Sequence, residues 1–499
     1  MNDFSAAGLG QADSLVELKK KTFSGIGVLI KRQVAVRLIC FAANIILARL
    51  LAPQVFGIYA IVIFVVQFFS TFADVGIGAA LIQKKGKLSR EEISTTFWLQ
   101  QVLVWCVAGI VMVAAPLALI IYPSLPPTGV WLIRAMAVSF AFASLKTIPA
   151  ILMERKVDFN RIALVDITET IAFYIAAISF ALTGFEVWSF IIAALVRALF
   201  GVVVMYSLSA WRPAPQFRFA AVKDLVRFGL PYQGNSILGF IKDAVTPVFV
   251  GMYAGAVAVG YVNWAKSLAF APLMLSETFG RVAFPAFSRI QEDRELLARA
   301  VERSIRCITL VMFPVTALMV ALGPEIVHVV FTNKWLPGLW AYYFYCTSPL
   351  IVGIVLPMYS AILAVGKSGI LLKMMVTLLA LEWGLGIPFV IVFGFNGIAF
   401  NQPIIGVLFY LIYRRVLRAE RVKISLSGNV KWQLCAAIGA GGICKAAAMQ
   451  LQATLVTVSG IFCAGIMIYL GIMYMLNKNI LEEFRDHFLK VAGRGEEKI

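Results

Sequence analysis

The chain has 499 residues, of which 61% are hydrophobic and 14% charged, and its mean hydropathy is +0.88. A water-soluble fold cannot bury that much apolar surface, so the composition excludes a soluble globular protein and indicates a bilayer protein. The 44 Lys and Arg against 26 Asp and Glu give a net charge of +18, which by itself is compatible with nucleic acid, anionic lipid or membrane topology.

Long apolar runs follow one another along the whole chain. Crossing about 30 Å of hydrocarbon takes about 20 apolar residues, and every backbone amide must be paired internally, so these runs predict helices. A membrane β-barrel would instead show alternating segments of about ten residues. The sequence therefore predicts an all-α polytopic membrane protein with about fourteen transmembrane helices, over residues 24–50, 55–82, 95–122, 129–152, 161–184, 186–209, 227–252, 257–285, 305–331, 338–365, 368–393, 396–414, 431–450 and 454–476.

Every second connection between these runs is basic. The loops 122–129 and 253–260 carry almost no charge, whereas the loops beside them are rich in Lys and Arg. By the positive-inside rule the basic loops are cytoplasmic, so both termini are predicted to lie inside. This topology accounts for most of the excess charge, and no nucleic-acid partner is expected.

A faint internal repeat appears when the chain is shifted by 203 residues, since Gly57 falls on Gly260 and Asp74 falls on Glu277. Chance is the alternative, because the identity is low. A duplication predicts two pseudo-symmetric six-helix bundles followed by a helix pair. The predicted parts are a cytoplasmic N-terminal segment (1–23), an N-terminal lobe (24–226), a C-terminal lobe (227–414), an extra helix pair (415–476) and a cytoplasmic C-terminal tail (477–499).

Polar residues recur inside the predicted helices, usually on one helical face. Such groups cost a few kcal/mol each in a bilayer, so they face protein or water and are candidates for function. Stripes on helices that correspond in the two halves predict a central hydrated cavity. The stripes contain Gln33, Arg37 and Asn44 in the first helix, Gln67 and Asp74 in the second, Asn235, Lys242 and Asp243 in the seventh, and Asn263, Lys266 and Glu277 in the eighth.

Three cations, Arg37, Arg197 and Lys242, fall near mid-helix with no evident counter-ion, and together they predict a site for an anion. Guanidinium groups favour bidentate contact with phosphate, so a phosphorylated substrate is expected. The alternative is that these residues form structural ion pairs between helices. The basic set extends to Arg134, Lys146 and Lys266, and possible partners are Asp74, Asp166, Glu169, Asp243, Glu277 and Glu382.

The acids Asp74, Asp243 and Glu277 are predicted to serve gating or coupling. Asp74 and Glu277 would lie near the cytoplasmic mouth and pair with cations in one access state only; a static salt bridge is the alternative. Either acid could carry a coupling ion, H⁺ or Na⁺. A further segment, 287–304, is predicted to be a charged amphipathic helix along the cytoplasmic interface, with Ile290, Leu297 and Val301 on its apolar side.

Sequence patterns of soluble enzymes are absent from the chain. There is no nucleotide-binding P-loop, dinucleotide-binding fingerprint, zinc-protease helix or hydrolase nucleophile elbow, so ATP hydrolysis is not expected. Membrane polymerases and ligases usually need an extended outer loop, and none of the predicted outer loops exceeds about ten residues. Seven scattered cysteines without a C-x-x-C pair, and two histidines, predict no metal site and no cofactor.

Several segments resemble a known family. The stretch ARLLAPQVFGIYAIVIFVVQFFSTFADVGIGAALIQ (48–83) is similar to the signature of the Wzx-type flippases, the polysaccharide-transporter branch of the multidrug/oligosaccharidyl-lipid/polysaccharide exporter superfamily. Further similarity is found in RFGLPYQGNSIL (227–238), VGYVNWAKSLAFAPLMLSETFGRVAFPAFSRIQ (259–291) and FTNKWLPG (331–338).

The resemblance implies two lobes around a cavity that opens alternately to the two sides of the bacterial inner membrane. It implies that the cargo is an undecaprenyl-diphosphate-linked glycan, moved to the periplasmic leaflet for cell-surface polysaccharide synthesis. Membrane lipids are the partners implied, with polymerase or export machinery as further candidates. Drug exporters and lipid II flippases share the fold, so two alternatives stay open, an ion-coupled multidrug antiporter and a membrane glycan polymerase or ligase.

Overall fold

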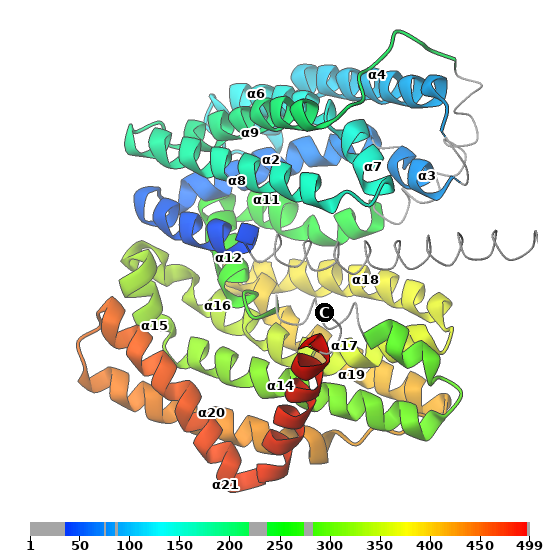
Figure 1. Cartoon of the computed structure of the whole chain (residues 1–499). Helices are drawn as coiled ribbons and strands as arrows, with labels where there is room; N and C mark the ends of the chain where they lie inside the picture. The colour runs from blue at the N-terminus through cyan, green and yellow to red at the C-terminus, as the bar shows by residue number, and fades with distance from the viewer. Residues whose placement is uncertain (1–34, 74–75, 85–87, 219–236, 274–282, 497–499) are drawn as a thin grey trace, which may run out of the picture. The chain divides into compact units, whose positions relative to one another are not determined.

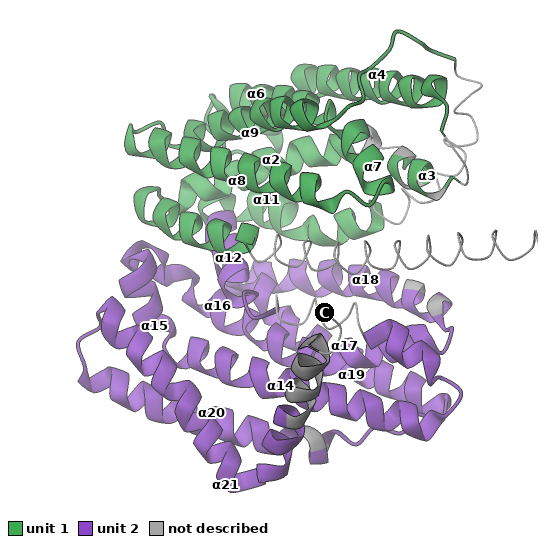
Figure 2. Cartoon of the chain, viewed as in Figure 1, with its two compact units in different colours: residues 1–257 green, residues 258–499 purple. Residues whose placement is uncertain are grey.

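The computed structural model describes residues 35–73, 76–84, 88–218, 237–273 and 283–496. Within these ranges the regular structure is helical and contains no strand (Figure 1). The chain divides into two compact units, residues 1–257 and 258–499 (Figure 2). The prediction of an all-α polytopic protein is therefore confirmed.

Unit 1 is built from long apolar helices joined by short loops. A helix over residues 35–50 comes first, and a short helix over 237–243 follows later in the unit. The other elements are α2 (Pro53–Ala73), α3 (Ile77–Gln83), α4 (Arg90–Ala114), α5 (Leu117–Ile121), α6 (Gly129–Ser144), α7 (Thr147–Arg155), α8 (Phe159–Leu182), α9 (Val187–Leu208), the π-helix η2 (Thr246–Val250) and α11 (Gly251–Tyr253).

Small residues hold the helices of unit 1 close together. Helix α9 packs against α8, α6 and α2, and α4 packs against α6 and α2. Ala137, Ala141, Ala193 and Ala198 are buried on these helices, where their short side chains let the backbones approach. Because van der Waals packing replaces the hydrophobic effect inside a bilayer, this close approach stabilises the bundle.

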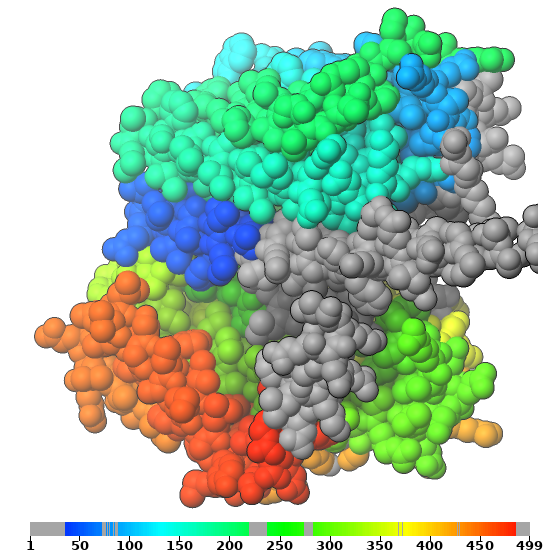
Figure 3. Space-filling model, viewed as in Figure 1, coloured from blue at the N-terminus to red at the C-terminus, as the bar shows by residue number. Residues whose placement is uncertain are grey.

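Polar caps mark the helix ends next to basic loops. Ser89 and Glu92 form a reciprocal capping box at the start of α4, and the Asp158 side chain accepts from the amide of Arg161 at the start of α8. The segment after α9 lies next to the N-terminal part of α4 (Figure 3). Trp98 Nε1 of α4 donates to the Ala214 carbonyl of this segment at 2.7 Å. The caps satisfy backbone amides that would otherwise be unpaired at the membrane boundary.

Unit 2 begins within α12 (Gly255–Ala269), whose first three residues belong to unit 1. A helix over 283–289 follows. The remaining elements are α14 (Arg294–Ala321), α15 (Gly323–Ile326), η3 (Val327–Phe331), η4 (Asn333–Gly338), α16 (Leu339–Tyr345), α17 (Thr347–Ala364), α18 (Ser368–Phe393), η5 (Gly394–Asn396), α19 (Gly397–Ala419), α20 (Leu426–Gln450) and α21 (Leu455–Glu496).

The core of unit 2 forms where α14 meets α17, α20 and α21. Leu297, Val301 and Ile305, spaced four residues apart on one face of α14, are fully buried in it. The prediction of a separate interfacial helix over 287–304 is therefore wrong. Asp293 caps α14, which runs unbroken from Arg294 to Ala321, so the predicted apolar side packs on protein.

The C-terminal residues predicted as a tail continue α21. The helix breaks at Asn477, where φ is −160°, and then resumes. Glu483 beyond the break pairs with Arg303 at 3.0 Å and with Arg306 at 3.2 Å, both on α14. These ion pairs and the buried Ile480 fix the beginning of the resumed helix to unit 2.

Nine segments of the described residues are long and apolar enough to cross a membrane. The predicted count of about fourteen stays a prediction, as do the lobe boundaries; unit 1 extends to residue 257, whereas the predicted boundary is at 226/227. Helix α2 begins at Pro53 and α12 at Gly255, which agrees within one residue with the 203-residue shift. Gly255 has φ of +82°, a conformation that glycine adopts without strain.

Candidate functional site

The strongest cluster of charges in unit 1 has one acid between two bases. Glu169 lies near the middle of α8 and is 3% exposed. Its Oε1 accepts from Nη2 of Arg197 at 3.0 Å and from Nε at 3.3 Å, while its Oε2 pairs with Nζ of Lys146. We call Lys146, Glu169 and Arg197 the Glu169 cluster. It carries one positive charge in excess.

A glycine makes room for this cluster. Gly201 lies on α9 one turn after Arg197, and a Cβ there would come within 2.5 Å of Glu169 Oε2 and 3.2 Å of Lys146 Nζ. A side chain at this position would displace the carboxylate from the place where it contacts both bases. The close approach of these helices and the ion pairs therefore depend on each other.

Arg197 is the exposed member of the cluster. Its side chain is 48% exposed, although it lies near the middle of α9. Arginine at the centre of a lipid-facing helix costs about 2.5–3.5 kcal/mol on insertion scales, so this side chain is expected to face water or protein. Glu169 accepts from Nε and Nη2 of the Arg197 guanidinium and not from Nη1. The Nη1 group can therefore donate to an anionic ligand.

The other predicted anion-binding residues are held by different partners. Lys242 pairs with the adjacent Asp243 at 2.9 Å. Arg134 donates to the Met112 carbonyl at 3.1 Å and lies over the ring of Trp131. The expectation that Arg197 and Lys242 have no counter-ion is wrong, because the acids predicted as possible partners, Glu169 and Asp243, neutralise part of their charge.

The remaining predicted residues are not part of the Glu169 cluster. Asn44 Nδ2 donates to the Tyr174 hydroxyl at 2.9 Å and so links the helix over 35–50 to α8. Lys266 lies over the Phe270 ring, 5.8 Å from its centroid. Arg37 and Asn263 are half-buried and Gln67 is exposed. Gln33, Asp74, Asn235 and Glu277 lie outside the described residues, so their predicted roles stay predictions.

Unit 2 contains an acid of the opposite kind. Glu382 lies near the middle of α18, and two consecutive side chains of α19 donate to it: Asn401 Nδ2 to Oε2 at 3.2 Å and Gln402 Nε2 to Oε1 at 3.1 Å. Asn401 is fully buried. Ser348 of α17 donates to Gln402 Oε1 at 3.4 Å. We call Ser348, Glu382, Asn401 and Gln402 the Glu382 cluster, and among the described residues no base pairs with its carboxylate.

The sequence offered a signal for this second cluster. Glu382 appears among the possible partners of cations, and an Asn-Gln pair in the middle of the next apolar run is unusual. Cations near mid-helix do not indicate the Glu382 cluster, because the amides that surround the acid come from a neighbouring helix and carry no charge. A carboxylate in hydrocarbon needs hydrogen-bond donors as much as it needs a counter-charge.

Two of the segments with family resemblance meet in unit 2. Trp264, from the segment 259–291, stacks on Trp335, from the segment 331–338, with ring centroids 5.3 Å apart. Trp335 is fully buried, and Phe331 packs edge-on against Trp264. These aromatic residues form a structural core. No group of three potential metal ligands occurs in the described part of the chain.

Comparison with known proteins gives a consistent picture. Residues 46–339 match the family described as "Polysaccharide biosynthesis protein". The chain is 28% identical over 293 residues to the succinoglycan biosynthesis transport protein ExoT of Rhizobium meliloti (strain 1021), with 58% of each chain covered. It is 26% identical over 328 residues to the lipopolysaccharide biosynthesis protein WzxC of Escherichia coli (strain K12), with 64% of this chain and 65% of the relative covered. Both alignments span less than two thirds of the relatives' length.

Solved structures show the same fold at low sequence identity. The lipid II flippase MurJ in an inward closed conformation superposes with a TM-score of 0.72 at 13% identity, over 91% of this chain and 100% of that chain. An inward-facing multidrug resistance transporter of the MATE family has a TM-score of 0.61 at 15% identity, over 79% of this chain and 99% of that chain. At such identities the likeness concerns the fold alone.

Proposed function

The chain belongs to the polysaccharide biosynthesis protein family, and from this premise we propose that it moves a lipid-linked oligosaccharide across the bacterial inner membrane. The cargo would be an undecaprenyl-diphosphate-linked glycan used for a cell-surface polysaccharide. Two relatives, the succinoglycan biosynthesis transport protein ExoT and the lipopolysaccharide biosynthesis protein WzxC, support this proposal. So does a fold that a lipid II flippase also has.

The observation that carries the proposal is the half-exposed guanidinium of Arg197. The Glu169 cluster holds two bases and one acid, so positive charge remains at mid-membrane depth. A diphosphate is a dianionic, multidentate acceptor that matches a guanidinium. A cationic drug would be repelled by the same charge, which disfavours the multidrug antiporter. No sequence signature favours a polymerase or ligase over a transporter.

The cluster supplies its own matched control. Replacing Arg197 by Ala leaves Lys146 to neutralise Glu169, and replacing Lys146 by Ala leaves Arg197 to do so. Lys146 is the less exposed of the two bases, so a diphosphate would contact Arg197. We expect Arg197→Ala to reduce transport of the lipid-linked glycan about tenfold or more, because a hydrogen bond between charged groups is lost. Lys146→Ala should reduce transport much less.

The measurement is the amount of lipid-linked glycan on the cytoplasmic side in a deletion strain that carries each variant, relative to the protein level in the membrane. Arg197→Lys keeps the charge but loses the fork geometry, so an intermediate value is expected. Equal transport by the Arg197→Ala variant and the unmodified protein would reject the diphosphate contact. Equal losses of transport in the two Ala variants would mean that the cluster has only a structural role as an ion pair.

We further propose that both termini are cytoplasmic, since the basic loops alternate with uncharged ones. Reporter fusions at Leu125, Ala256 and Arg421 test the orientation. Leu125 inside, or Arg421 outside, would reverse it.

We also propose that transport is coupled to a proton carried by Glu382. Glu382 is an acid near the middle of a spanning helix, its hydrogen-bond partners are neutral amides, and no base in the described part of the chain pairs with it. A proton can therefore bind or leave there without breaking an ion pair. The Asn401 oxygen accepts from Gln402, and the Gln402 oxygen accepts from Ser348. Both amide oxygens, which a sodium ion would need as ligands, therefore already accept hydrogen bonds, and this favours a proton over Na⁺.

A further inference from the structure

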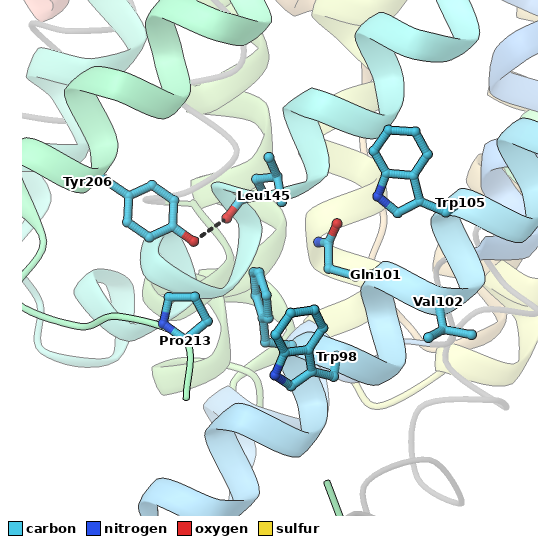
Figure 4. Close-up of a pocket in the computed structure, with 8 residues that line it drawn as sticks. Trp98, Gln101, Val102, Trp105, Leu145, Tyr206 and Pro213 are labelled. Carbon is cyan, nitrogen blue, oxygen red and sulfur yellow. Dashed lines mark hydrogen bonds between the residues drawn. The ribbon is translucent and has the colours of Figure 1, made fainter. Parts of the chain in front are cut away.

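A pocket in unit 1 has no role in the proposed transport. It lies between α4, the junction of α6 and α7, and the end of α9, and its volume is about 460 Å³ (Figure 4). Trp98 and Trp105 of α4 form one wall, and Tyr206 and Pro213 form the other. This volume is in the range of sites that hold one small molecule or one chain of a lipid, about 300–1,000 Å³.

Two aromatic residues of the lining, Trp98 and Tyr206, already use their polar ends. Trp98 Nε1 donates to the Ala214 carbonyl at 2.7 Å, and the Tyr206 hydroxyl donates to the Leu145 carbonyl at 3.0 Å. The rings therefore present carbon to the pocket. An apolar chain is the ligand that such a lining accepts.

One buried side-chain atom in the lining is without a partner among the described residues. Gln101 is 4% exposed, and its Oε1 accepts from Ser144 Oγ at 3.1 Å. Its Nε2 has no hydrogen-bond partner among the described residues, and the side chain extends from α4 toward Leu145 and Tyr206 (Figure 4). A buried N–H without an acceptor is unfavourable, so an occupant that brings a neutral oxygen to this position gains a hydrogen bond.

The exposed apolar face of α4 borders the pocket at Val102 and Trp105, which line it. Val102, Trp105, Ile110 and Val113 are exposed and apolar, and α4 is long and apolar enough to span the bilayer. An exposed apolar face on a spanning helix is in contact with acyl chains. Lipid can thus reach the pocket from within the membrane.

A cation lies at the edge of the pocket. The exposed Arg212 guanidinium lies over the Tyr206 ring, 5.5 Å from its centroid, and it is fixed there by donating to the carbonyls of Tyr206 and Ser209. The pocket therefore offers three kinds of group: an apolar aromatic wall, the neutral N–H donor of Gln101, and the positive charge of Arg212 at the edge. A glycerophospholipid has the same order of groups: acyl chain, ester carbonyl and phosphate.

We propose that this pocket binds one anionic phospholipid. One acyl chain lies between Trp105 and Tyr206, the ester carbonyl accepts from Gln101 Nε2, and the phosphate is attracted to Arg212. A polyprenyl diphosphate fits less well, because it has no neutral acceptor between its chain and its charged group. The proposal does not depend on what the protein transports.

Native mass spectrometry of the full chain tests it, with phosphatidylglycerol and its diether analogue, which lacks ester carbonyls, as probes. We expect the unmodified protein to retain the ester lipid about five to ten times better than the ether lipid, because only the ester carbonyl can accept a hydrogen bond from Gln101 Nε2. Gln101→Leu should abolish that preference. Gln100→Leu, which changes the neighbouring amide outside the pocket, should keep it.

Arg212→Gln should abolish the preference for phosphatidylglycerol over phosphatidylethanolamine and leave the ester preference intact. Equal retention of ester and ether lipid by the unmodified protein would overturn the proposal even if the Gln101 variant failed to fold. Displacement of the phospholipid by undecaprenyl phosphate would also overturn it and would make the pocket a site for the cargo's chain.

Discussion

Glu169 of unit 1 and Glu382 of unit 2 are both glutamates near the middle of spanning helices, yet the structure surrounds them in opposite ways. Glu169 receives two bases, and Glu382 receives two amides and, among the residues described, no base. The Glu169 carboxylate is shared by two cations, and these ion pairs hold α8 to α9 and to Lys146. An acid among amides changes its charge at less cost to its neighbours, because no cation loses a partner. The first arrangement suits structure and anion binding, and the second suits proton exchange.

The largest effect on stability should come from Glu169→Gln. The substitution leaves Lys146 and Arg197 facing a neutral amide in a buried place, which should destabilise the protein by about 3 kcal/mol. The isosteric change Glu382→Gln removes no ion pair of the described residues, but its NH2 group faces one of the two amide donors, so one hydrogen bond is lost at a cost of about 1–2 kcal/mol. Unfolding of the purified variants in one detergent compares them.

A second variant tests the cause of the first effect. Glu169→Gln combined with Arg197→Gln removes an anion and a cation together, so part of the lost stability should return. Equal destabilisation by Glu169→Gln and Glu382→Gln would contradict the difference between the two clusters.

Glu382→Gln should have a small effect on stability but a large effect on transport. We expect Glu382→Gln to lower proton-driven transport about tenfold or more and to remove its dependence on the pH gradient, because an amide carries no exchangeable charge. The assay follows a fluorescent lipid-linked glycan in vesicles with an imposed pH or sodium gradient. Glu325→Gln, which breaks the 2.8 Å pair with Lys445, is the control and should retain pH-dependent transport. Transport driven by sodium alone would contradict proton coupling.

Gly201→Ala should disturb the Glu169 cluster through geometry alone. The added Cβ would come within 2.5 Å of Glu169 Oε2, so the carboxylate must move and its contacts with the two bases are disturbed, at a cost of about 1 kcal/mol or more. Gly109→Ala in α4 is the matched control, since nothing lies within 4 Å of a Cβ there, and it should be neutral or slightly stabilising. If thermal unfolding shows the same change for both, Gly201 is not needed for the ion pairs.

The sequence predicted the helical class, most of the helix positions and the family, which the match over residues 46–339 confirms. It also identified Arg197 as a cation near mid-helix, and Glu169 as one of six acids that could pair with the cations. It did not pair them, because the pairing depends on how α8 and α9 pack around Gly201, and helical periodicity describes only one helix at a time. For the same reason the amides around Glu382, contributed by α19, gave no pattern in the run that contains the acid.

The segment 287–304 shows a further limit of periodicity. Its amphipathic pattern has two physical solutions, an apolar face on lipid or an apolar face on protein, and the sequence alone does not separate them. Here α20 and α21 pack on α14, and the core of unit 2 buries Leu297 and Val301. The partner helices lie more than a hundred residues further along the chain, so no local signal indicates them.

The smallest effect should come from Glu483→Gln, which removes the pairs with Arg303 and Arg306. All three side chains are partly exposed, so water screens the charges, and we expect a loss under about 1 kcal/mol that disappears at high salt. In contrast, the loss caused by Glu169→Gln should persist at high salt, because Glu169 is buried. Thermal unfolding at low and high ionic strength measures both variants side by side. A salt-independent loss for Glu483→Gln would mean that the resumed part of α21 depends on these pairs as strongly as α8 and α9 depend on the Glu169 cluster.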